Sequence, residues 1–382
     1  MSQSQTTETR LPQIDGLRAI AIIAVVLFHY VNNQLTQTHG WLASNLSLAT
    51  SFGWCGVDLF FVLSGFLITR ILLKRVDSPS YFRTFYARRS LRILPVYFLF
   101  LLTWFLVVRS GMSLESNFLN QVSAVPFWSY FLMVQNIIMA QQQDLGNPVL
   151  SLTWSIGIEE QFYVLFPFVV FLFKFRNLVA LLVMAIVTAN LSRLACTHWI
   201  PAYVAPHCRM DSLSFGALVA CLEFRGYLKS TRIVLGLSFV VSAITIFASC
   251  YWFFCRDLGP LKHTIVAMIF ACTAGIAVSD RCKTLNYFLT NRILGFFATI
   301  SYSLYLTHFL VLGLFHEWIA GNHYIGIQSW FDVQISAAAF GTSVALSFMI
   351  YRSIELPFIK IGKRIPYTPA RSQATVFSST GI

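Results

Sequence analysis

Charged residues are scarce in this sequence, and acidic residues are scarcer than basic ones. Only 11% of the 382 residues are Asp, Glu, Lys or Arg, whereas soluble domains carry about 25%. Hydrophobic residues make up 57%, and apolar segments of about 20 residues recur from end to end. So little polar surface excludes a soluble fold. The composition predicts an all-α integral membrane protein built as a polytopic helix bundle.

The usual signs of a metal site and of a cleaved leader are also missing. None of the eight cysteines forms a C-x-x-C pair, so we expect no metal site. Residues 1–13 are polar, and no small-residue cleavage site follows the first apolar run. We therefore expect a retained first helix and no permanently bound cofactor.

The net charge of +12 comes from basic residues in short loops between apolar runs. Seven Lys or Arg against one acidic residue lie in 70–92, none lies in 111–152, and five lie in 352–371. Short basic loops mark the cytoplasmic side of a membrane protein. We therefore predict a multi-pass protein of a bacterial inner membrane with both termini cytoplasmic, in contact with membrane lipid and with no nucleic-acid partner.

Two termini on one side require an even number of crossings, and ten apolar runs are long enough. These runs lie at about 14–35, 52–73, 93–110, 153–173, 177–194, 208–224, 232–249, 262–279, 294–315 and 331–351. The segment 124–140 is also apolar, and we expect it to be re-entrant or interfacial, covered by protein. The predicted plan is a tail at 1–13, one transmembrane domain at 14–360 and a C-terminal cytoplasmic tail at 361–382.

The first apolar helix carries an arginine near its start and a histidine deep inside it, Arg18 and His29. Eleven residues make about three turns, so both side chains lie on one face, roughly 16 Å apart along the axis. An intramembrane histidine indicates a functional site, although a neutral core histidine bonded to a backbone carbonyl is the alternative. Asp58 reaches a similar depth and could orient His29, or it could cap the second helix.

The stretch TWSIGIEEQFYVLFP places two adjacent carboxylates, Glu159 and Glu160, early in the apolar run 153–173. Adjacent helical residues point about 100° apart, so only one acid readily faces the bundle interior. A buried glutamate could act as a base or as a hydrogen donor. The alternative is an acid-rich helix start, favoured by the helix dipole.

Three later groups complete the candidate residues. Arg209 and Asp211 lie at an outer helix end, and His308 lies about as deep as His29, after Ser301, Tyr302 and Tyr305. The basic group Arg88, Arg89 and Arg92 has helical spacing at the start of the third span. It could bind a phosphorylated donor, or it could form a solvated or lipid-binding face.

Six of these stretches, in this order and spacing, resemble the acyltransferase-3 family of integral-membrane O-acyltransferases. They are LPQIDGLRAIAIIAVVLFHY, GVDLFFVLSGFLIT, RRSLRILPVY, TWSIGIEEQFYVLFP, RMDSLSFGAL and ISYSLYLTHF. The resemblance implies about ten spans, a central role for Arg18 and His29, and an acyl-CoA donor on the cytoplasmic side. It also implies a glycan or glycolipid of the bacterial envelope as acceptor.

We therefore predict an acyltransferase that moves an acyl group, acetyl by preference, from acyl-CoA to a hydroxyl of a cell-envelope or exported glycan. The predicted catalytic residues are His29, Asp58, Glu160 and His308. The predicted acyl-CoA-binding residues are Arg18, Arg88, Arg89 and Arg92. The predicted substrate-binding residues are Trp154, Ser155, Glu159, Tyr163, Arg209, Asp211, Ser301, Tyr302 and Tyr305. The alternative function is a proton-coupled transporter or flippase that uses the intramembrane His and Glu residues.

Overall fold

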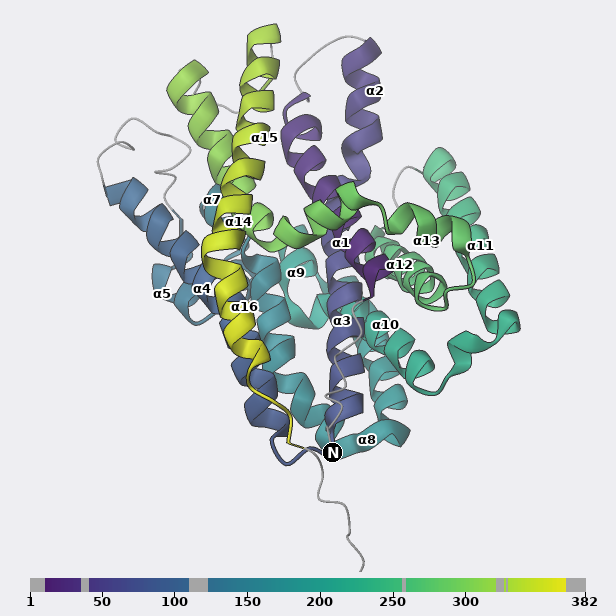
Figure 1. Ribbon diagram of the computed structural model, residues 1–382. Coiled ribbons are helices and arrows are strands. Elements are labelled where there is room, and N and C mark those ends of the chain that lie inside the picture. Colours follow the sequence, from purple (N-terminus) through teal and green to yellow (C-terminus); the bar gives the residue numbers. More distant parts are fainter. Residues whose placement is uncertain are drawn as a thin grey trace, which may run out of the picture.

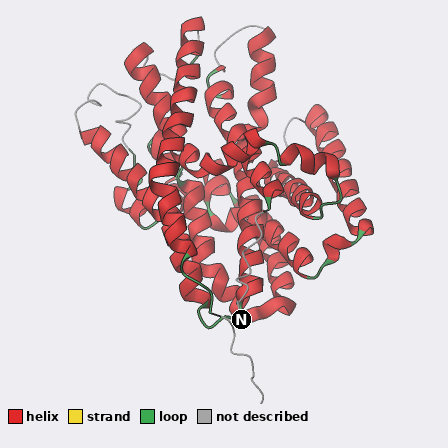
Figure 2. Ribbon diagram, in the orientation of Figure 1, coloured by secondary structure: helices red, strands yellow, loops and turns green. Residues whose placement is uncertain are grey.

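The computed structural model describes residues 11–35, 41–109, 123–255, 259–320, 326–327 and 329–368. In this part of the chain the regular structure is helical throughout (Figures 1 and 2). The elements are α1 (Pro12–Leu27), η1 (Phe28–Asn32), α2 (Trp41–Thr50), η3 (Ser51–Cys55), α3 (Gly56–Arg75), α4 (Tyr81–Arg109), α5 (Phe127–Phe131), α6 (Gln135–Gln142), α7 (Pro148–Ser151), α8 (Trp154–Ala195), α9 (Trp199–Val204), α10 (Pro206–Phe224), η4 (Tyr227–Lys229), α11 (Thr231–Cys255), η5 (Gly259–Leu261), α12 (Lys262–Val278), α13 (Lys283–Leu289), α14 (Arg292–Ala320), α15 (Trp330–Ile350), η6 (Tyr351–Glu355) and α16 (Leu356–Lys363).

Eight helical stretches of the described chain are long and apolar enough to cross a membrane. They are Pro12–Asn32, Ala43–Arg75, Tyr81–Arg109, Pro148–Phe173, Asn177–Ala195, Gly259–Val278, Arg292–Ile319 and Trp330–Lys363. These stretches confirm the predicted all-α multi-pass membrane protein. The two other expected spans fall on α10, which carries three charged residues, and on α11, of which only Thr231–Thr245 is counted as a shorter apolar helix. The predicted number of ten is therefore approximate.

Helix α8 contains two of these spans and doubles back on itself. Forty-two helical residues in a straight line would reach about 63 Å. The two ends nevertheless meet, because the Trp154 ring lies over the Arg209 guanidinium and Arg193 donates a hydrogen bond to the carbonyl of Cys208. The expected spans 153–173 and 177–194 are thus two antiparallel halves of one helical segment.

The segment 124–140 is not a spanning helix. It forms α5 and α6, of five and eight residues, joined through a left-handed residue, Met133 (φ 54°). Its polar side chains are buried and bonded: Gln135 donates to the Thr153 carbonyl at 2.7 Å, and Gln161 donates to Asn136 at 2.8 Å. Broken backbone at membrane depth needs such cover by protein, which agrees with the expected re-entrant or interfacial segment.

Helices α3 and α10 cross in near contact at two glycines. A Cβ atom added at Gly65 would lie 2.0 Å from the Leu213 carbonyl oxygen, and one added at Gly216 would lie 1.8 Å from that of Val62. Small residues let membrane helices approach this closely. Helix α3 stands at the centre of the bundle beside α10 (Figure 1), so this contact fixes the position of a central helix.

Two π-helical turns interrupt the helices at residues with functional side chains. The turn η1 follows α1 and contains His29, and η6 follows α15 and contains Glu355. A π turn inserts one extra residue into a helix and is frequent at functional sites. Helix α14 lies against both α1 and α15, so the two turns belong to one side of the bundle.

Gly216→Ala should destabilise the protein, because the added methyl group meets backbone that cannot rotate away. We expect a cost of about 1–3 kcal/mol, as for other overpacked sites. Gly341→Ala in α15 is the control: nothing lies within 4 Å of its added Cβ, and alanine favours a helix over glycine by about 1 kcal/mol. The midpoint of thermal unfolding in detergent should fall for the first variant only. Equal midpoints would contradict the close contact.

Candidate active site

A cavity opens inside the bundle between α1, α3, α4, α8 and α14. Its empty volume is about 860 Å³, including the part of its mouth that is open to solvent. Ten of the predicted site residues lie on its wall. They are Arg18, Arg89, Arg92, Ser155, Glu159, Glu160, Tyr163, Ser301, Tyr302 and Tyr305. The folded chain thus brings together residues that are up to 287 positions apart in the sequence.

The two glutamates of the cavity differ in their bonding. Both carboxylate oxygens of Glu159 accept hydrogen bonds, one from Ser64 at 2.8 Å and one from Tyr163 at 3.1 Å. The Oε1 atom of Glu160 is buried and has no hydrogen-bond partner in the described chain. Glu159 is therefore bonded within the wall, and Glu160 keeps an acceptor available for a ligand.

Three of the four predicted donor-binding arginines share the cavity, and the fourth does not. Arg18 donates to Ser301 at 3.2 Å, and Arg89 lies over the Tyr163 ring at 5.1 Å. Arg88 instead donates to the Ile365 carbonyl at 3.0 Å and lies over the ring of Tyr367. Arg88 thus contacts the C-terminal segment and is not part of the cavity wall, and its predicted role in donor binding stays a prediction.

Two histidines face each other between α14 and the turn that follows α1. His308 Nε2 lies 3.1 Å from His29 Nδ1, and His308 Nδ1 lies 2.9 Å from the carbonyl oxygen of Leu304. His308 is fully buried, whereas His29 is partly exposed. The ring of Tyr305, a cavity residue, is 6.1 Å from that of His308. The predicted equal depth of the two histidines is confirmed, and their catalytic role stays a prediction.

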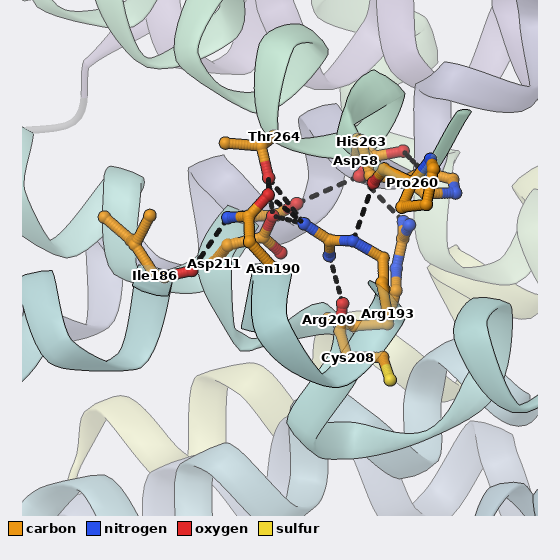
Figure 3. A network of polar contacts seen from close by, with 11 residues as sticks. Asp58, Ile186, Asn190, Arg193, Cys208, Arg209, Asp211, Pro260, His263 and Thr264 are labelled. Carbon is orange, nitrogen blue, oxygen red and sulfur yellow. Dashed lines mark hydrogen bonds and ion pairs between the residues drawn. The ribbon is translucent and has the colours of Figure 1, made fainter. Parts of the chain in front are cut away.

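Asp58 does not orient His29. Its Oδ1 atom accepts hydrogen bonds from Arg209 at 2.7 Å and from Ser212 at 2.9 Å, and its Oδ2 atom lies 3.4 Å from His263 Nδ1 (Figure 3). The Asp58 and Arg209 side chains are 0% exposed. Asp58 therefore forms a buried ion pair between α3 and α10, because these partners surround it on the face turned away from α1.

Arg209 and Asp211 also lie outside the cavity wall, although we predicted that they bind substrate. Arg193 and Asp211 form a second buried ion pair at 2.7 Å, with side chains 0% exposed, and Thr264 donates to the same carboxylate (Figure 3). The guanidinium of Arg209 lies over the rings of Trp154 and Tyr203.

The uncharged rings of Trp154 and Tyr203 both lie against the buried guanidinium of Arg209. Trp154 is 4% exposed, and its ring centroid lies 4.6 Å from that of Tyr203. Trp154 is not part of the cavity wall either. Burial raises the pKa of the Tyr203 phenol to about 12, although Arg209 opposes the shift. The two networks in Figure 3 thus lie outside the cavity wall, and they leave Arg209 Nε and Nη1 and Asp211 Oδ1 buried without a hydrogen-bond partner in the described chain.

Four polar residues of these sites escaped the sequence analysis: Ser64, Glu355, Arg193 and His263. Glu355 is buried, accepts a hydrogen bond from Ser303 at 3.0 Å and interacts electrostatically with Arg92 and Arg18. Ser64 is a single polar residue in an apolar stretch, whereas Arg193, His263 and Glu355 have polar or charged neighbours in the sequence. Neither pattern indicates the distant partners of these residues.

The fold and the cavity define a class: a multi-pass membrane protein with guanidinium groups in an internal cavity and an imidazole pair beside it. Comparison with known families identifies the class more closely. The acyltransferase-3 model, described as an acyltransferase domain, matches residues 11–352. The chain belongs to this family, whose description as an acyltransferase domain favours an enzyme over the transporter alternative.

Named relatives agree with this assignment. The O-acetyltransferase OatA of Staphylococcus aureus strain NCTC 8325 and the protein of the same name in strain COL are each 28% identical to the chain over 388 residues. The matches cover 94% of this chain and 59% of each relative, so the chain spans about three fifths of their length. No solved structure matches the sequence.

Asp58→Asn should destabilise the protein, because it leaves the buried Arg209 guanidinium without its counter-ion. Breaking a buried pair costs about 3–5 kcal/mol, and the double variant Asp58→Asn/Arg209→Met should recover much of that loss. Glu223→Gln is the control, since it breaks the partly exposed pair with Arg70, which is worth at most about 1 kcal/mol. Thermal unfolding in detergent measures all three. An Asp58→Asn variant as stable as the control would contradict the pairing.

Proposed function

We propose that this O-acyltransferase takes an acetyl group from acetyl-CoA and transfers it to a hydroxyl of a cell-envelope or exported glycan. The observation that carries the proposal is the cavity, which collects three arginines and extends to Tyr305, whose ring lies 6.1 Å from that of His308. The acetyl group is supported by the names of the relatives. The glycan follows from the acceptors that the family resemblance implies.

An acyl-CoA donor suits the charges of the cavity. Its wall carries three guanidinium groups, Arg18, Arg89 and Arg92, against two carboxylates, of which Glu159 is already bonded to Ser64 and Tyr163. Guanidinium groups bind phosphates through strong charge-assisted hydrogen bonds. CoA carries phosphates at one end and the thioester at the other, so the arginines would hold the first end while the thioester extends toward Tyr305.

In a direct transfer, His29 acts as the general base. Its imidazole takes the proton of the acceptor hydroxyl while the hydroxyl oxygen attacks the thioester carbonyl carbon. The bond from that carbon to sulfur then breaks. The proton passes from the imidazolium to the departing sulfur, so the products are the O-acetyl ester and free CoA.

The orientation of the chain in the membrane follows from its basic loops. Seven of the 27 Lys and Arg residues lie at 70–92 and five at 352–371, and these two basic stretches lie together, since Ser78 donates to the Thr368 carbonyl at 2.7 Å. Basic loops stay in the cytoplasm. We place this end of the bundle, with both termini, on the cytoplasmic side of a bacterial inner membrane, where acyl-CoA is available.

Replacing Arg18, Arg89 or Arg92 with Gln should weaken CoA binding. Each loses charge-assisted contacts worth about 1.5–3 kcal/mol, which corresponds to roughly 10–150-fold in Kd. Arg88→Gln is the matched control from the same basic stretch, because Arg88 bonds the C-terminal segment outside the cavity. Isothermal titration of CoA into the purified variants measures the affinities. Unchanged affinity in all three cavity variants would place the donor elsewhere.

His29→Gln should lower kcat and leave CoA affinity near the wild-type value, because His29 lies beyond the arginines and is proposed to move a proton. Loss of a general base costs about 10²–10⁴-fold in rate. Turnover of radiolabelled acetyl-CoA by purified protein in the presence of acceptor measures kcat, and titration of CoA measures binding. Wild-type turnover in this variant would remove His29 from the reaction.

A further inference from the structure

The contacts of the histidine pair determine where its protons lie. A backbone carbonyl oxygen can only accept a hydrogen bond, so the His308 Nδ1 atom, 2.9 Å from the Leu304 oxygen, must carry a proton. In a neutral imidazole the other nitrogen then has the lone pair. His308 Nε2 is therefore an acceptor, and His29 Nδ1, 3.1 Å away, must donate to it.

The same rule now applies to His29. With its proton on Nδ1, the neutral ring has its lone pair on Nε2. The ring also has a hydrogen-bond contact with the backbone carbonyl of Val25, one turn earlier, which can share the Nδ1 proton with His308 but, being an acceptor, cannot bond to the Nε2 lone pair. The two rings also differ in exposure, because His308 is fully buried and His29 is partly exposed. The accessible member of the pair therefore holds the free lone pair, and the buried member has both nitrogens engaged.

We propose that His308 is a positioning residue. By accepting the Nδ1 proton of His29, it holds that ring in the tautomer whose Nε2 lone pair can take a proton from the acceptor hydroxyl. When His29 becomes an imidazolium during transfer, the same contact becomes a charge-assisted hydrogen bond and strengthens. The Leu304 carbonyl completes the chain by holding His308 in turn. This role rests on the proposed general-base function of His29.

Nitrogen NMR of histidine-labelled protein tests the tautomer directly. The ¹⁵N shifts of the two ring nitrogens separate a protonated from an unprotonated position, and the His29 signals are those lost in His29→Gln. In wild-type protein we expect the His29 proton on Nδ1 and none on Nε2. In His308→Met, which leaves the Val25 carbonyl as the remaining partner of the ring, a fraction of the proton should move from Nδ1 to Nε2. A wild-type His29 protonated on Nε2 would overturn the proposal, whatever the fate of the variants.

Kinetics of two His308 variants separate positioning from packing. The amide oxygen of Gln can accept the Nδ1 proton of His29, whereas Met has a similar length and suits an apolar site better. We expect His308→Met to lose kcat by roughly 10–150-fold, the value of a hydrogen bond to a charged group. His308→Gln should lose much less, and CoA affinity should stay constant in both.

Equal activity of the two variants, or higher activity of Met, would mean that His308 only fills space. The failure of the proposed function looks different. If His29→Gln turns over normally, the general-base assignment is wrong, while the NMR spectrum of the wild-type protein still reports the tautomer. Constant CoA affinity shows that both His308 variants are folded.

Discussion

The ion pair between Asp58 and Arg209 is the contact on which the rest of the bundle depends. It joins α3 to α10 within a mostly apolar interior, where a charge without its partner costs several kcal/mol. The same two helices touch backbone to backbone at Gly65 and Gly216. Charge pairing and close approach therefore act on one interface. Since α3 also supplies Ser64 to the cavity wall, the position of that wall follows from this pair.

The second ion pair, between Arg193 and Asp211, joins α8 to α10. Arg193, at the end of α8, bonds Asp211, the Cys208 carbonyl and the Pro260 carbonyl, so it ties the returning half of α8 to α10 and to the start of α12 (Figure 3). The first half of α8 then presents Glu160 to the cavity. Each charge of the two ion pairs thus has an opposite charge beside it. Buried atoms without a hydrogen-bond partner in the described chain remain in both places: Glu160 Oε1 at the cavity, and Arg209 Nε and Nη1 and Asp211 Oδ1 in the networks.

Composition and depth counting were sufficient for the fold class, for most of the cavity residues and for the similar depth of His29 and His308, whereas the contact between the two rings was not predicted. They failed for Asp58, because depth along a helix does not give direction around it. Asp58 and the cavity residue Ser64 are six positions apart on α3, which is about 240° around the helix after the full turn is removed. Asp58 therefore faces α10, and its partner Arg209 lies 151 positions away. The sequence provides no rule that connects two such residues.

The arginines of α4 show a related limit of sequence analysis, because helical spacing does not distinguish between neighbouring residues that have different partners. Arg88 and Arg89 are both within one turn of Arg92, so helical spacing predicts that all three share a face. What separates them is the C-terminal segment, which binds Arg88 through the Ile365 carbonyl and the Tyr367 ring. That contact spans 277 positions and could not be inferred from local spacing. The cavity wall carries three guanidinium groups and two carboxylates, and Glu355 and Asp15 add negative charge beside Arg18. A phosphate ligand would therefore be recognised through directed N–H donors of the guanidinium groups, because the acidic residues leave no surplus of positive charge to attract it.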